Sequence, residues 1–116
     1  MVNKEKKINN YFTEIEENAI VKYNKTNNID EKNRLFRNII EPAFTTMIEA
    51  IIRRYNLRVA NETFDETFND AMTFMISKLD RYKKDNGKAY SYMQAVCKNH
   101  LIAKRIELNK IILRDV

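Results

Sequence analysis

The chain has one glycine and one proline in 116 residues. Strands and hairpins use these two residues at their turns, so the sequence is poorly suited to a sheet and well suited to helices. Hydrophobic residues make up 44% of the chain, which is enough for the core of one small domain. The sequence therefore predicts a compact all-α fold in which residues 1–116 form a single domain.

Apolar residues at spacings of three and four predict about four helices. The first is expected over residues 11–24, with a buried face formed by Phe12, Ile15, Ala19 and Tyr23. The second is expected over residues 31–55, with inward-facing Leu35, Ile39, Phe44, Ile48, Ile51, Ile52 and Tyr55. Pro42 lacks an amide hydrogen, so it should break or kink this second helix near Ile40 and then fit the first turn of the helix that continues.

A loop at 56–62 is expected to lead into a third helix. Thr63 and Glu66 have the spacing of a capping box, and an apolar stripe follows at Phe64, Phe68, Ala71, Met75, Leu79 and Tyr82. The segment KKDNG at 83–87 predicts a turn with positive backbone angles. The last helix is expected over residues 88–113, with Tyr92, Val96, Ile102 and Ile106 facing inward and Asn99 where an apolar residue would be expected.

The charges are unevenly distributed along the chain. Residues 58–80 carry two basic and five acidic side chains, whereas residues 81–114 carry nine basic and two acidic ones. An acidic stripe beside a basic half indicates two partners of opposite sign. An uneven solvated surface without a partner would have the same composition, so charge alone does not choose between these readings.

No arrangement of residues predicts catalysis. The only histidine, His100, has no cysteine or carboxylate at a spacing suited to sharing a metal, and a surface position is expected for it. No third group orients His100 toward Cys97, which is expected to pack as a small apolar residue. Asp65, Glu66 and Asp70 are interpreted as a solvated acidic face rather than as magnesium ligands. We expect a protein that is not an enzyme and that carries no cofactor or metal.

The sequence also favours a cytoplasmic location. No apolar run is long enough to span a membrane. The start, MVNKEKKINN, lacks the apolar core of a signal peptide. A single cysteine cannot form an internal disulfide, which suits a reducing compartment.

An acidic-polar segment, ETFND at 66–70, leads to the aromatic Tyr82 and then to a short basic turn with glycine, KKDNGK at 83–88. The pair Ser91-Tyr92 follows and opens the segment MQAVCKNHLIAKRIE at 93–107. This order of an acidic-polar helix ending in an aromatic residue, a basic turn, a Thr-Tyr or Ser-Tyr pair and a second helix resembles the conserved-region-2 helical domain of bacterial sigma factors. The chain is most similar to the late-transcription sigma factors of T-even-like phages, with which it shares an early Asn-Tyr, an Arg54-Tyr55-Asn56 element and a Cys97-x-Asn99 element.

The resemblance implies a phage promoter-specificity factor that binds the multisubunit RNA polymerase core of a bacterial host. Such domains dock on the clamp coiled-coil helices of the largest subunit, and the family's contact positions fall here on Glu66, Asn69, Asp70, Met72, Thr73 and Ile76. The spacing of Glu66, Asn69, Asp70 and Thr73 predicts one shared face, opposite the phenylalanine stripe. Acidic side chains there would form charge-assisted bonds with arginines. Without the resemblance, a face that only keeps the helix solvated and complements its dipole is favoured.

The resemblance also implies opening of promoter DNA at a minus-ten-like element. The matching positions are Lys83, Lys84, Lys88, Tyr90, Tyr92, Gln94, Lys98, Asn99, Lys104 and Arg105. Tyrosine rings can stack on bases, lysines can neutralise phosphates, and amides such as that of Gln94 can read an adenine edge. Periodicity turns Tyr92 toward the core, which leaves Tyr90 as the better candidate for an exposed ring.

The resemblance divides the chain into supporting helices at 1–57 and a polymerase- and DNA-binding helical pair at 63–113. Housekeeping sigma factors carry a tryptophan pair where this chain has Ala95 and Val96. This difference implies weak melting, or dependence on another factor such as a separate phage co-activator or a sliding clamp. Two alternatives stay open: a polymerase-binding co-activator or inhibitor that does not contact DNA, and a generic basic helical DNA-binding protein.

Overall fold

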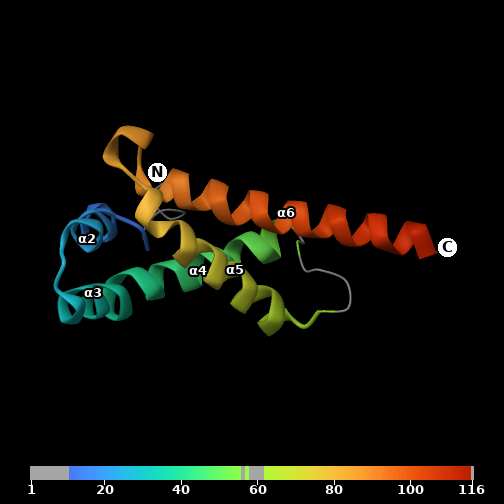
Figure 1. The fold of residues 1–116 in the computed structure, drawn as a ribbon, viewed down its shortest axis with the longest axis horizontal. Helices are drawn as coiled ribbons and strands as arrows, with labels where there is room; N and C mark the ends of the chain where they lie inside the picture. Colours follow the sequence, from blue (N-terminus) through green and yellow to red (C-terminus); the bar gives the residue numbers. More distant parts are fainter. Residues whose placement is uncertain (1–10, 56, 58–61, 116) are drawn as a thin grey trace, which may run out of the picture.

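The computed structural model describes residues 11–55, 57 and 62–115 (Figure 1). Within these ranges the fold is all-α, as predicted, and contains no strand. The helices are α2 (Glu14–Lys25), α3 (Ile29–Leu35), α4 (Glu41–Tyr55), α5 (Phe64–Lys78) and α6 (Ala89–Asp115), with the short segments η1 (Phe36–Ile40), η2 (Leu79–Arg81) and η3 (Lys84–Asn86). Most of the loop expected at 56–62 lies outside the described residues.

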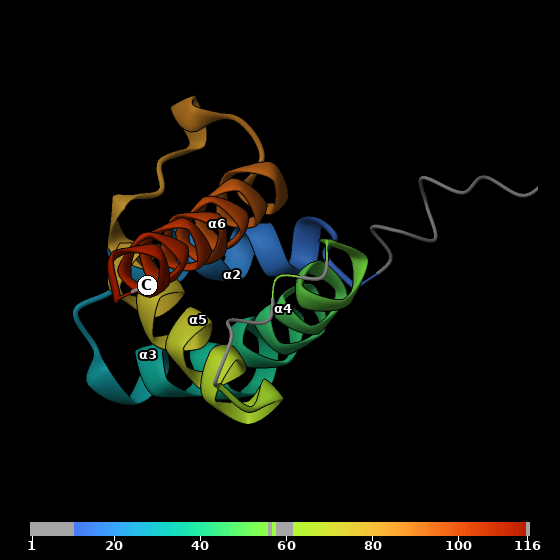
Figure 2. The same ribbon diagram turned by 90° about the vertical axis from the view of Figure 1, so that its right-hand side faces the viewer.

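Figures 1 and 2 show how the helices are arranged. The α3–η1–α4 segment forms one continuous rod, and α6 forms a second rod on the other side of α5. Helix α5 packs against both rods, and α2 lies beside η1 and the start of α6. The turn between α5 and α6 projects from the body of the molecule near the start of α6.

Helix α2 begins three residues later than predicted because Thr13 caps it. The Thr13 amide donates a hydrogen bond of 2.6 Å to Glu16 Oε1, and the Ile15 amide donates one of 3.2 Å to Thr13 Oγ1. The buried residues of α2 are Ala19 and the fully buried Ile20. The prediction that Ile15 is buried was therefore wrong, because its side chain is 65% exposed.

Pro42 deforms the second predicted helix without breaking it. The five residues before Glu41 wind as a π-helix, and the Glu41 amide donates to the carbonyl of Phe36. A proline in a helix cannot donate to the preceding turn and collides with the carbonyl four residues back, so a wider turn at this point accommodates the ring. The expected irregularity near Ile40 is confirmed, and Pro42 lies in the first turn of α4.

The core lies where α4 and α5 meet α2 and α6. Fully buried side chains come from Ile20, Ile40, Phe44, Met47, Ile48, Met75, Leu79, Met93 and Leu101. Between α2 and the end of α5, Asn24 Nδ2 donates to the carbonyls of Leu79 at 3.0 Å and Tyr82 at 3.3 Å. Tyr55, predicted to face inward, is exposed instead, because it lies at the last turn of α4.

The buried face of α6 differs from the predicted one. Ala89, Met93, Cys97 and Leu101 are buried at regular spacings of four. Tyr92, Val96 and Ile102 flank this stripe and are half-buried, whereas Ile106 is 51% exposed, so the prediction that it faces inward was wrong. Asn99 lies on the exposed side and does not interrupt the core.

Candidate functional site

The start of α5 presents an exposed polar row. The capping box predicted at Thr63 is confirmed, since the Thr63 amide donates to Glu66 Oε1 at 2.7 Å and the Glu66 amide donates to Thr63 Oγ1 at 3.1 Å. The hydrogen bond from the Thr63 amide, and another from its side chain to the carboxylate, lower the pKa of the Glu66 carboxyl. Asn69 and Thr73 continue the exposed row, and Ile76 adds an apolar side chain that is 38% exposed.

Two residues predicted on this surface are placed differently. Met72 is only 9% exposed and packs in the core, so it is not available for contact with a partner. Asp70 lies on the predicted face with its side chain 39% exposed, but its carboxylate is turned toward His100 and Lys104 of α6.

Asp70 joins a cluster of charged side chains between α5 and α6. Its Oδ2 atom lies 2.7 Å from His100 Nε2 and 3.2 Å from Lys104 Nζ, and Lys104 Nζ also lies 3.3 Å from Glu62 Oε2. Burial opposes ionisation of Asp70, but the hydrogen bonds from His100 and Lys104 outweigh it and lower the pKa of this carboxyl. Burial likewise opposes the charge on Lys104, and its bonds to Asp70 and Glu62 outweigh it and raise its pKa.

His100 is not the plain surface residue that the sequence predicted. Its ring stacks on Phe74 with a centroid separation of 3.9 Å and an interplanar angle of 10°. Together with the bond to Asp70, this stack fixes the imidazole against α5. Cys97 does pack as a small apolar residue, as predicted, and burial raises the pKa of its thiol to about 12.

The turn between α5 and α6 carries Lys83, Lys84 and Lys88, which are all exposed. Gly87 has a φ of 93°, which confirms the positive backbone angle predicted for this turn. The Tyr82 hydroxyl donates to the Gly87 carbonyl at 2.6 Å, and the Ala89 amide donates to Glu17 Oε1 at 2.9 Å. The turn is therefore anchored on both sides while its lysines remain exposed.

A pocket of about 150 Å³ lies between α4 and α6, lined by Tyr11, Ala50, Ile51, Arg54, Tyr55, Tyr90 and Gln94. The Tyr90 ring packs edge-on against Tyr11, with centroids 6.0 Å apart, and against Phe12 at 5.7 Å. Burial and the hydrogen bond with Tyr90 raise the pKa of Tyr11. Lys98 Nζ lies 4.2 Å from the centroid of the Tyr55 ring at the pocket's edge.

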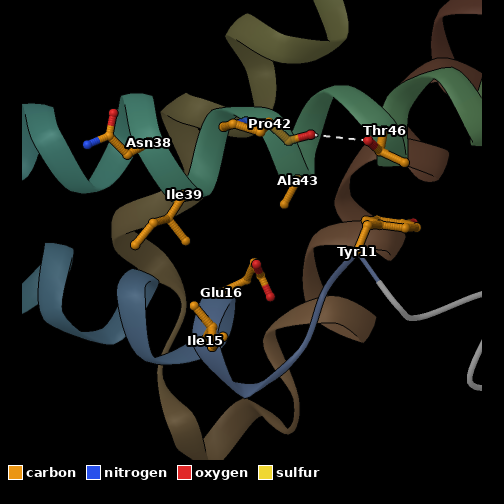
Figure 3. A pocket seen from close by; sticks show the side chains of 8 residues that line it. All are labelled: Tyr11, Ile15, Glu16, Asn38, Ile39, Pro42, Ala43 and Thr46. Atoms are coloured by element: carbon orange, nitrogen blue, oxygen red, sulfur yellow. Dashed lines mark hydrogen bonds between the residues drawn. The ribbon is translucent and has the colours of Figure 1, made fainter.

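A second pocket, of about 340 Å³, lies between α2 and the α3–η1–α4 rod (Figure 3). Ile39 and Ala43 approach it from the rod, Ile15 and Glu16 approach it from α2, and Tyr11 lies toward one end. Tyr11 thus contributes to both pockets. The Glu16 carboxylate makes this second pocket unfavourable for a phosphate-bearing ligand.

The predicted DNA-binding residues fall into separate groups. Tyr90 and Gln94 line the smaller pocket with Lys98 beside it, whereas Lys104 belongs to the charged cluster. Tyr90, expected to be the more exposed ring, is half-buried. Further residues have no pocket role: Tyr92 packs against Tyr82 at a centroid distance of 5.5 Å, and Asn99 and Arg105 are exposed along α6.

Tyr11, Arg54 and Tyr55 are the pocket residues to which sequence reasoning gave no role. Arg54 and Tyr55 lie 35 or more residues before Tyr90, and Tyr11 precedes the first helix. The available signal was the Arg54-Tyr55-Asn56 element and the early Asn-Tyr, both of which carry polar aromatic residues. Asn56 itself lies outside the described residues.

Neither a metal centre nor a membrane span is found in the described part of the chain. No group of three or more histidine, cysteine or acidic side chains there is arranged to hold a metal ion. No helix among those residues is both long and apolar enough to cross a bilayer. Comparisons with protein-family models, with curated proteins and with solved structures gave no match. The resemblance to sigma factors therefore stays a prediction.

Proposed function

We propose that this protein is a sigma-type promoter-specificity factor of a phage. It would bind the clamp coiled-coil of a bacterial-type RNA polymerase core through α5 and hold an opened minus-ten-like DNA strand along the α5–α6 turn and α6. The proposal rests on the sequence resemblance together with the placement of an aromatic pocket, a basic turn and an exposed polar row on adjoining elements.

The observation that carries the proposal is the pocket between α4 and α6. Its tyrosine rings and apolar side chains suit a flat nucleobase, and stacking of a base on an aromatic side chain contributes about 1–3 kcal/mol. The Gln94 amide can both donate to and accept from a base edge. Arg54 and the nearby Lys98 supply positive charge for the adjacent phosphates.

The exposed row on α5 supports the protein-binding half of the proposal. Glu66, Asn69 and Thr73 offer a carboxylate, an amide and a hydroxyl to a basic partner, and Ile76 adds apolar contact area. A carboxylate can form charge-assisted hydrogen bonds with an incoming arginine. The row is formed without Met72, which supports the core instead.

Binding to purified bacterial core RNA polymerase tests the role of α5. Asn69→Lys places a positive charge in the exposed row and is expected to weaken binding by roughly tenfold or more, because a like charge opposite a basic partner surface is repulsive. Asp30→Asn on α3 changes the net charge by the same amount at an exposed position on another helix and should bind as the wild type does. Equal affinity of Asn69→Lys and wild type would overturn the assignment of this surface.

Promoter-dependent transcription tests the role of the pocket. Linear templates randomised over the minus-ten-like segment would be transcribed by core polymerase with the protein, and the selected sequences read from the transcripts. Gln94→Leu keeps the size of the side chain but removes the amide, so transcription should fall by roughly tenfold while core binding is retained. If wild-type protein with core polymerase selects no sequence, the sigma-type function is wrong.

One observation favours a second function, that of a polymerase-binding module that does not contact DNA. Lys98 and Lys104 are both engaged within the protein, with Tyr55 and with the carboxylates of Asp70 and Glu62. The effect of such a module on transcription would be lost in the Asn69→Lys variant and kept in the Gln94→Leu variant. The two variants together therefore separate a sigma-type factor from a co-activator or inhibitor.

A further inference from the structure

The charged cluster between α5 and α6 brings together one residue from each of the two proposed binding surfaces. Asp70 comes from the polymerase-binding helix and Lys104 from the DNA-binding helix, and their charged atoms lie 3.2 Å apart. The cluster is only partly buried, since the Lys104 side chain is 31% exposed and that of Asp70 is 39% exposed. A ligand can therefore reach both groups without unfolding either helix.

We propose that this cluster is an intramolecular latch that couples the two binding events. In the free protein Asp70 and Glu62 neutralise Lys104 and hold it against α5. A cationic side chain of the protein partner that binds Asp70 releases Lys104 toward a DNA phosphate. The inference rests on the proposed function and adds to it a regulatory contact that keeps the free protein from binding DNA well.

The charge balance of the cluster supports this coupling. Two carboxylates surround one lysine ammonium and the His100 ring, and with the imidazole counted as neutral these groups carry a formal charge of −1, which repels phosphate. Adding one partner cation brings the sum to zero. An arginine can bind a carboxylate through two parallel bonds and so competes well with the single bond that Lys104 makes to Asp70. Linkage requires that DNA binding strengthen partner binding by the same factor.

Single-stranded DNA binding by the isolated protein gives the first test, with a short fluorescein-labelled oligonucleotide and fluorescence anisotropy at fixed salt. Asp70→Asn keeps the shape of the side chain and removes the competing charge, so affinity should rise by roughly two- to fivefold. The dependence on salt should steepen by about one phosphate contact. Asp65→Asn, an exposed position on the same helix, changes the net charge equally and serves as the matched control.

Lys104→Gln makes the test specific for the latch. In the otherwise wild-type protein this change should lower DNA affinity less than it does in the Asp70→Asn background, because the two carboxylates hold Lys104 away from phosphate. In the Asp70→Asn background it should abolish the gain. Equal effects of Lys104→Gln in both backgrounds, or an equal gain in Asp65→Asn, would overturn the latch. If circular dichroism shows that Asp70→Asn is unfolded, Glu62→Gln releases Lys104 from the other carboxylate and carries the same expectation.

Core polymerase separates failure of the latch from failure of the proposed function. With core bound, Lys104→Gln should weaken capture of the same DNA by roughly two- to fivefold, which is more than it weakens DNA binding by the free protein. If the wild-type protein binds core and DNA, but Lys104→Gln weakens DNA binding no more with core than without it, the latch alone is refuted. Wild-type protein that binds neither core nor DNA would refute the latch together with the function on which it rests.

Discussion

Replacing Gly87 by alanine should destabilise the protein through backbone strain alone. Gly87 has a φ of 93°, and a Cβ added there would have no heavy atom within 4 Å, so no steric overlap contributes. Holding a non-glycine residue in this region costs about 1–2 kcal/mol. Restricting the unfolded chain returns about 0.4–1 kcal/mol of that loss, so the expected net destabilisation is about 1 kcal/mol.

Thermal unfolding followed by circular dichroism measures this effect. For a domain of this size, a loss of about 1 kcal/mol corresponds to a decrease in Tm of roughly 4 °C. Asparagine tolerates positive φ better than alanine, so Gly87→Asn should unfold closer to the wild type and provides the matched control. An alanine variant as stable as wild type, or an asparagine variant as unstable as alanine, would show that the left-handed backbone is not what Gly87 supplies.

Three further experiments test other parts of the structure. Thr63→Ala should lose about 1 kcal/mol in chemical denaturation because the cap of α5 is removed, whereas Thr63→Ser should stay near wild type. The buried Cys97 thiol, with its pKa raised to about 12, should react with a disulfide reagent at neutral pH far more slowly in the native protein than in denaturant. Because the folded pKa of Asp70 lies below its ordinary 3.8, its ionised form stabilises the fold above that pH and the stabilisation is lost as the pH falls through the folded value. The difference in unfolding free energy between wild type and Asp70→Asn should therefore shrink as the pH falls below about 4; a difference that grows over that range would contradict this.

Features fixed by neighbouring residues were predictable from the sequence. The capping box at Thr63 and Glu66 and the turn at Gly87 each depend on side chains or backbone freedom within a few positions. The irregularity before Pro42 was also predictable, because it follows from one missing donor. Its form was not, since a π-helical turn and a sharp kink both relieve the same clash.

Features that depend on how helices cross were not predictable. Helix α6 carries two adjacent apolar stripes, and the small residues Ala89 and Cys97 on the buried one give a weaker signal than Tyr92 and Ile106 on the other. Asp70 and His100 are separated by 30 residues, and only the crossing of α5 and α6 makes them partners. The pocket between α4 and α6 also depends on how the helices cross, because its walls come from α4, α6 and the segment before α2.

The α5–α6 association does not depend on the ion pairs that a partner would have to open. Met93 and Leu101 are fully buried on the inner face of α6, and burying such a side chain contributes about 1.5–3 kcal/mol. A partly exposed ion pair typically contributes about 0–1 kcal/mol. Opening the contact between Asp70 and Lys104 therefore leaves the two helices packed as before and changes only which charges face solvent. A small energy difference of this kind is what a binding partner can reverse without unfolding the domain.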